Sequence, residues 1–196
     1  MRTSIVHAAF LVAVLLLLAP SHAVADGIVL SIQPVSSTVS VGSTFAVDVN
    51  ISGVTDLYDY QFDLSFNPAV LQATNVLEGA FLSSGGATYF IPGTIDNTAG
   101  NMTFNADTLL SAISGVSGDG TLAVFDFTAI ATGTSALNID PTTFILLDST
   151  LANINATTTN GSVTVQGVAV PEPSVLTLVS MGLLILAGLT LKRTIL

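Results

Sequence analysis

The chain has 196 residues, of which 13 are acidic, three are Lys or Arg and none is Cys. No Lys or Arg lies between Thr3 and Leu191, and no His lies between Ala23 and Leu196. A phosphate-binding surface needs cations, so we expect no nucleic-acid partner. Catalysis through a Ser-His or Cys-His pair and zinc sites made of His and Cys are excluded between Ala23 and Leu196, because this part of the chain has neither His nor Cys.

Residues 1–25 have the pattern of a secretory signal peptide. Arg2 supplies a positive charge, and an apolar run over residues 8–19 follows it. Ala23 and Ala25 form the small-x-small pattern of a signal cleavage site. We therefore expect secretion across the inner membrane.

The C-terminal end has three parts. Residues 168–174 form a linker, Val175–Leu191 is apolar, and residues 192–196 begin with two bases. As a helix the apolar part would reach about 26 Å at about 1.5 Å per residue, which marginally spans the hydrocarbon core of a membrane. The bases favour a cytoplasmic location for the tip. We expect a C-terminal transmembrane helix.

The linker contains Pro171, Glu172 and Pro173. Together with the apolar helix and the basic tip, this motif resembles the PEP-CTERM sorting signal of Gram-negative bacteria. The resemblance implies recognition and processing by exosortase, a membrane protease-transpeptidase, and a link to exopolysaccharide and biofilm. It implies a transient membrane anchor, followed by release to the cell surface or extracellular matrix.

Residues 26–167 have the length of one domain and can bury a sizeable core. Glu172 is the one acidic residue outside this range, so the domain holds 12 of the 13 acids and no base. Such a body repels other acidic surfaces and has no salt bridges of its own.

The pattern of this domain is one of strands and turns. Tyr58–Phe66 alternates most clearly, with its aromatic and aliphatic side chains toward the core and Asp59, Gln61 and Asp63 toward solvent. Thr44–Ile51 alternates in the same way. Turn signals bound the other predicted strands: Val70–Val76, Thr88–Ile95, Asn101–Ala106, Leu122–Ala131, Ser135–Ile139, Phe144–Leu147 and Ser162–Val165.

These strands predict an all-β fold, an antiparallel sandwich. Several segments, in chain order, resemble a cohesin domain, which is a jelly-roll β-sandwich of about nine strands. They are Val39–Val54, Leu57–Val76, Glu78–Leu82, Asn101–Asp107, Ser117–Phe127 and Asn160–Val165. The resemblance covers nearly all of residues 26–167. It implies binding of dockerins, which are small calcium-loaded helical modules, through polar groups on one sheet face.

Carried onto this chain, the resemblance implies a partner-binding face that includes Asp59, Gln61 and Asp63. Asp107 matches a position that is acidic in some cohesins, and we expect it on the same face. Acidic acceptors there would pair with hydroxyls or cations of a partner. The same residues also fit the ordinary solvated side of an amphipathic strand.

Two other classes of function stay open at this point. A carbohydrate-binding module for exopolysaccharide usually needs an exposed aromatic platform, and the chain has no Trp and only Tyr89 outside the expected core face. A glycosidase would need two carboxylates in catalytic geometry. The acids are scattered and lack an apolar context, so we expect no enzyme and no catalytic residue.

Oxygen ligands in a domain without cations suit calcium. Asp96, Asn97 and Asn101 are close in sequence, and Asp119 lies between glycines. The chain lacks the loop motif of calcium sites, however, and turn chemistry explains these residues. We therefore expect no metal and no other cofactor, with calcium as the alternative.

Taken together, the sequence predicts a secreted or surface-sorted, non-enzymatic binding or assembly module of the bacterial envelope or matrix. Its expected partner is a dockerin-like or other envelope protein, with exopolysaccharide as the alternative.

Overall fold

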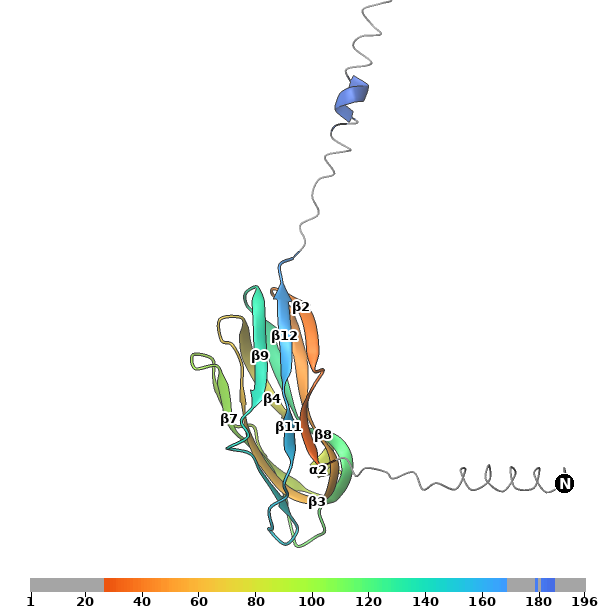
Figure 1. Cartoon of the computed structure of the whole chain (residues 1–196), viewed down its shortest axis with the longest axis vertical. Helices are drawn as coiled ribbons and strands as arrows, with labels where there is room; N and C mark the ends of the chain where they lie inside the picture. The colour runs from red at the N-terminus through yellow and green to blue at the C-terminus, as the bar shows by residue number, and fades with distance from the viewer. Residues whose placement is uncertain (1–26, 169–178, 180, 186–196) are drawn as a thin grey trace, which may run out of the picture.

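The computed structural model describes residues 27–168, 179 and 181–185. Within residues 27–168 two layers of β-strands enclose one hydrophobic core (Figure 1). The elements, in chain order, are β1 (Val29–Gln33), β2 (Ser36–Ser40), β3 (Thr44–Ser65), β4 (Leu71–Glu78), α2 (Ala80–Ser83), β5 (Thr88–Ile91), β6 (Thr94–Asp96), β7 (Asn101–Leu109), β8 (Val116–Ala129), β9 (Gly133–Ile139), β10 (Ile145–Asp148), β11 (Thr157–Thr159) and β12 (Gly161–Gln166).

The long strand β3 belongs to both layers. Its first half pairs with β1 and β8, and its second half pairs with β7 and β10. The register with β8 shifts after Val49 and again around Val54, and such bulges bend a strand and increase its twist. The sequence predicted two strands here, Thr44–Ile51 and Tyr58–Phe66. The structure joins them, because residues 52–57 also belong to the strand.

The remaining strands complete the two layers. One layer contains β4, β8, the first half of β3, β1 and β11, and the other contains β5, β6, β7, the second half of β3 and β10. At one end, β9 pairs with the last residues of β3 and with β12, and β12 pairs in parallel with β2.

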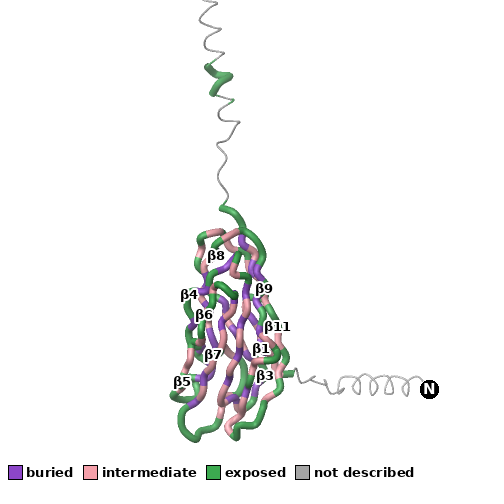
Figure 2. The backbone as a smooth tube through the Cα atoms, turned by 90° about the vertical axis from the view of Figure 1, so that its left-hand side faces the viewer, coloured by how far each residue is buried: buried purple, intermediate pink, exposed green. Residues whose placement is uncertain are grey.

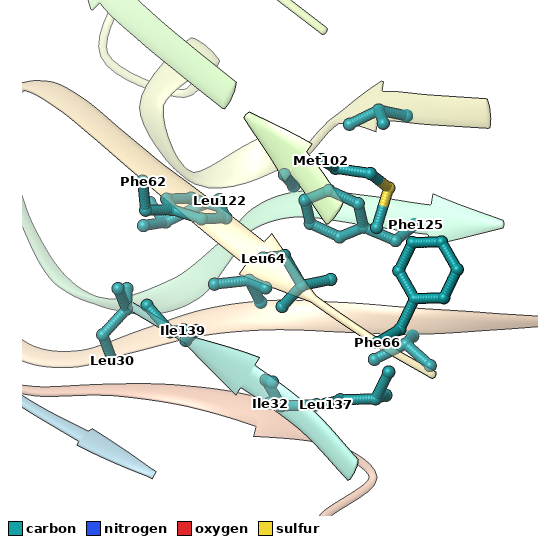
Figure 3. Packing of buried hydrophobic residues seen from close by; sticks show 14 of the residues in the cluster. Leu30, Ile32, Phe62, Leu64, Phe66, Met102, Leu122, Phe125, Leu137 and Ile139 are labelled. Atoms are coloured by element: carbon teal, nitrogen blue, oxygen red, sulfur yellow. The ribbon is translucent and has the colours of Figure 1, made fainter. Parts of the chain in front are cut away.

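The core lies between the layers, where inward side chains from both meet. The Phe62 ring lies 5.7 Å from that of Tyr60 and 6.0 Å from that of Phe125. Phe125 comes from the opposite layer (Figure 3). Buried backbone runs along the strand interiors, and the loops at the ends are exposed (Figure 2). In the part of the chain that the structure describes, the buried core residues lie between Leu30 and Val165, so residues 27–168 contain a hydrophobic core of their own.

Apart from the joining of two predicted strands in β3, the nine strands predicted from the sequence are confirmed, with three further differences. Thr88–Ile95 is divided into β5 and β6, because Pro92 lacks the N–H that a ladder needs, and both parts pair with β7. Three short strands, β1, β2 and β11, were not predicted. Neither was the helix α2, a single turn that places Phe81 and Leu82 in the core.

The expected signal peptide (residues 1–25, with Ala23 and Ala25) and the motif Pro171, Glu172 and Pro173 lie outside the described residues. So does most of the expected helix Val175–Leu191. Among the residues that the structure describes, no helix has the length and apolar character needed to cross a membrane.

Candidate functional site

The outer side of the layer formed by β10, β3, β7 and β5 is the candidate binding surface, here called the β3–β7 face. In antiparallel strands, residues directly opposite one another point to the same side of the sheet. Two cross-strand rows follow from the register: Leu147, Asp59, Thr108 and Tyr89 in one, and Ile145, Gln61, Ala106 and Ile91 in the other.

The centre of the face is polar and carries small side chains, and larger apolar side chains lie along both edges. Asp59 and Gln61 stand on β3 beside the small Thr108 and Ala106 of β7. Tyr89, 62% exposed, lies along one edge. Partial burial raises the pKa of Asp59, and a hydrogen bond with the Thr108 side chain opposes that shift. The arrangement fits contact with a protein surface better than capture of a small molecule.

Asp63 lies at the end of this face, and part of its role is structural. The Phe104 N–H donates a hydrogen bond of 2.7 Å to Asp63 Oδ1. Phe104 has a φ of 61° and is 50% exposed, and the β3–β7 register shifts at this point. Asp63 therefore holds a β-bulge in β7. It also lines a hollow of about 370 Å³ together with Asn101, Asn138 and Asp140.

Asp107 was expected on the same outward face, and this expectation is wrong. Its side chain lies on the core side of β7 and is 2% exposed. The bulge at Phe104 is the reason, because one extra residue moves every later side chain to the opposite side of the sheet. Asn105, Asp107 and Leu109 turn inward, and Ala106 and Thr108 take the outer positions.

Asp56 fixes the loops at one end of the face, a role that the sequence did not indicate. The Gly115 N–H donates to Asp56 Oδ1 at 2.6 Å, and the Ser149 hydroxyl donates to Asp56 Oδ2 at 2.6 Å. These hydrogen bonds, that of Ser149 above all, lower the pKa of Asp56. Asp56 thus ties the bend of β3 to the loop before β8 and to the loop after β10.

The residues weighed as calcium ligands serve turns and loops instead. Asp96 Oδ1 accepts the N–H groups of Thr98 and Ala99, which lowers the pKa of Asp96. Asn97 bonds to the backbone of Ala73 on β4, and Asp119 accepts the N–H of Gly53. Within residues 27–168, 179 and 181–185 no group of three acidic or His side chains is placed to hold a metal ion.

Fold and site together define a binding module: a β-sandwich whose broad outer face is polar in the centre and apolar at both edges. Residues 28–165 match the cohesin domain family. The chain belongs to this family, whose domains are non-enzymatic protein–protein interaction modules. The predicted cohesin-like fold is confirmed.

Similar proteins come from bacteria and from an archaeon. Cellulose-binding protein A of Clostridium cellulovorans is 28% identical over 134 residues, which are 67% of this chain but only 7% of that protein. CaCohA2 of Clostridium acetobutylicum, solved in complex with CaDoc0917, is 26% identical, with a TM-score of 0.58 over 71% of this chain and 99% of that one. A non-cellulosomal cohesin from the archaeon Archaeoglobus fulgidus shares the fold at 18% identity, with a TM-score of 0.57 over 72% and 92%.

Proposed function

We propose that residues 27–168 bind a dockerin-like or other envelope protein through the β3–β7 face. The observation that carries this proposal is the pair of cross-strand rows, in which Asp59 and Gln61 lie beside the small Ala106 and Thr108. A partner element can approach the backbone closely over the small residues, and the flanking polar groups remain free to pair with it. The complex between CaCohA2 and CaDoc0917 supports a protein as the partner class.

The chemistry of the partner follows from the charge of this domain. Between Thr3 and Leu191 the chain has no Lys or Arg, so the β3–β7 face offers carboxylate, amide and hydroxyl groups but no cationic one. Hydroxyl groups and cations on the partner complement such a face and steer the encounter. We therefore propose a partner with Ser, Thr, Lys or Arg at the contact.

The binding test places a large charged side chain in the middle of the face. Ala106→Arg should weaken binding of the partner at least about tenfold, because the new side chain prevents close approach. Gln72→Arg is the matched control, since it adds the same charge on β4 in the other layer, where Gln72 is exposed. Partners captured from the host's secreted fraction by residues 27–168 are identified, and their affinities are then measured with purified proteins.

Three outcomes are distinguishable in this test. Loss of affinity in Ala106→Arg alone supports the β3–β7 face, and equal affinity of both variants contradicts it. Capture of purified exopolysaccharide, with no protein captured, would replace the proposal by the carbohydrate-binding alternative, for which Tyr89 is the one exposed tyrosine on the face.

We further propose that the domain works outside the inner membrane. The signal peptide pattern of residues 1–25 and the motif Pro171, Glu172 and Pro173 support secretion followed by exosortase processing. Val175–Leu191 would hold the chain in the membrane until that step. The final location would be the cell surface or extracellular matrix.

Replacement of Pro171, Glu172 and Pro173 by Ala should abolish processing while leaving secretion intact. The expected result is accumulation of a longer, membrane-associated form, seen by fractionation and immunoblotting, because the apolar segment is retained. A double Ala replacement at Val168 and Val170, just before the motif, is the control. Normal processing of the Pro-Glu-Pro variant would contradict the sorting proposal.

A further inference from the structure

Asp107 is a buried carboxyl group in an unusual position. It lies on the core side of β7, between Tyr60 of β3 and Phe90 of β5, and is 2% exposed. Neither of its carboxyl oxygens has a hydrogen-bond partner among the described residues. An ionised carboxylate without partners is costly at such a site.

The groups around Asp107 offer little compensation for a negative charge: the backbone N–H of Thr108 lowers the pKa of Asp107, but burial and the charge of Glu78 outweigh this effect. The Tyr60 hydroxyl donates to the Leu122 carbonyl oxygen at 2.6 Å, and the Tyr58 hydroxyl donates to Ser111, so neither proton is directed at Asp107. Glu78, at the end of β4, brings a second carboxyl group against Asp107. The other titratable groups nearby are Asp59 and Tyr89, both on the outer side of the sheet, and α2 (Ala80–Ser83) contains none.

Neither a basic side chain nor a metal ion is available to neutralise a negative charge on Asp107. Every Lys, Arg and His of the chain lies outside the domain. Both oxygens of Asp107 are closed off from solvent, which leaves no room for a hydrated metal ion. A proton needs no space, and on Asp107 it would give the hydrogen that the Glu78 carboxylate can accept.

We propose that Asp107 and Glu78 form a proton-binding pair, in which Asp107 holds a proton taken from solvent and donates it to the Glu78 carboxylate in the folded domain. This inference does not depend on the proposed partner. It makes folding of the domain proton-linked.

The electrostatic environment supports this assignment. Burial, followed by the charge of Glu78, raises the pKa of Asp107 from 3.8 to about 7. Between these two values Asp107 holds a proton in the folded domain that it has lost in the unfolded chain. The stabilising effect is therefore complete below about pH 4 and is lost as the pH rises through about 7, with the unfolding constant increasing about tenfold per pH unit between them. Carboxyl groups with a lowered pKa act in the opposite sense, but only below about pH 4: Asp56, Asp96, Asp140 and Asp148.

Loss of the proton also affects the edge strand β5. Glu78 Oε1 accepts a hydrogen bond of 2.6 Å from the Thr88 hydroxyl, which ties the end of β4 to the start of β5. When Asp107 ionises, the two carboxylates repel, and the exposed Glu78 is the one able to move toward solvent. β5 then loses this tie to β4 and keeps its pairing with β7 and the packing of Phe90 against the core. Tyr89 and Ile91 of the β3–β7 face are carried by this strand.

The test is urea unfolding of residues 27–168 between pH 5 and pH 8. Wild type should lose stability over pH 5 to 7 with a slope of about one proton. Asp107→Asn should lose most of this slope and be more stable than wild type at pH 8, because the amide is neutral and can still donate to Glu78. Asp48→Asn, which removes a charge on the outer side of β3, should keep the wild-type slope.

Several results would overturn the proposal. One is an unchanged slope in Asp107→Asn, and another is a wild-type stability that rises with pH over this range. A third is stabilisation of wild type, but not of Asp107→Asn, by millimolar Ca²⁺ at pH 8, which would make the pair a metal site.

A second measurement uses only the wild-type protein and so does not depend on whether a variant folds. Carbon-13 NMR of wild-type protein labelled at Asp carboxyl groups should show one Asp titrating near pH 7. Titration of all Asp residues below about pH 5 would contradict the proposal. Between pH 6 and 8 the amide exchange rate, corrected for its intrinsic pH dependence, should increase more in β5 than in β8. Equal increases in the two strands would overturn the link to the edge strand.

Discussion

Phe62→Ala is expected to lower the free energy of unfolding by about 3–5 kcal/mol. Phe62 is fully buried, and its ring contacts Tyr60 in its own strand and Phe125 in the opposite layer. Removal of the ring leaves a cavity that the two layers can close only by moving toward each other. Since domains of this size are stable by about 5–15 kcal/mol, the variant should be partly unfolded under mild heating.

Urea unfolding of residues 27–168 at pH 6 measures this difference. Tyr89→Ala is the control, because it also removes an aromatic ring from this half of the fold but from an exposed position. Its effect should stay within about 0.5 kcal/mol. Similar losses in both variants would contradict the position of Phe62 as the contact between the layers.

Gly79→Ala should cost about 3 kcal/mol through overpacking. A Cβ at this position would lie against the Thr121 carbonyl and 2.6 Å from the carbonyl carbon of Leu122, both in the backbone of β8. The φ of Gly79 is −82°, which any residue adopts, so the effect is steric. The main chain must move, and with it the bond from the Gly79 N–H to the Leu122 oxygen.

The matched control for this second prediction is Gly27→Ala. A Cβ at Gly27 meets no atom within 4 Å, so the free energy of unfolding should change by less than about 0.5 kcal/mol. Because Gly79 directly follows Glu78, the Gly79→Ala variant should also alter the pH dependence that the Asp107–Glu78 pair produces. Equal stability of the two Gly variants would show that β4 and β8 are less closely packed than described.

The sequence predicted the strand that carries the face, because polar and apolar residues alternate along it and give it one solvent-exposed and one buried side. In Tyr58–Phe66 the alternation is unbroken, and the structure buries Tyr60, Phe62 and Leu64 and leaves Asp59 and Gln61 on the outer side. Regular alternation of this kind maps directly onto the two sides of a sheet.

The assignment of Asp107 failed because alternation is lost where a strand contains a bulge. From Met102, a regular strand would have placed Phe104 and Ala106 inside, and nothing in the residues 101–107 marks Phe104 as an αL position. The bulge depends on Asp63, 41 residues earlier in the chain. The contact of Glu78 with Asp107 is equally non-local, so sequence reasoning did not find it.

The unpredicted strands have a related cause. β11 consists of three Thr residues, and β2 has one apolar residue in five, so neither has an apolar side that alternation can reveal. They are strands because β1 and β12 lie beside them as partners.

These pairings determine when the domain can finish folding. Val29 pairs with Thr157 and Ser36 with Ser162, at separations of 128 and 126 residues (157 − 29 and 162 − 36). Contacts so distant along the chain raise the contact order, and closing such long loops slows folding. A chain that leaves a ribosome or a translocation channel with its N-terminus first exposes β1 and β2 long before β11 and β12 arrive. The sandwich can close only after Gln166 has emerged, so such a chain is still open while nearly all of the domain passes through the channel.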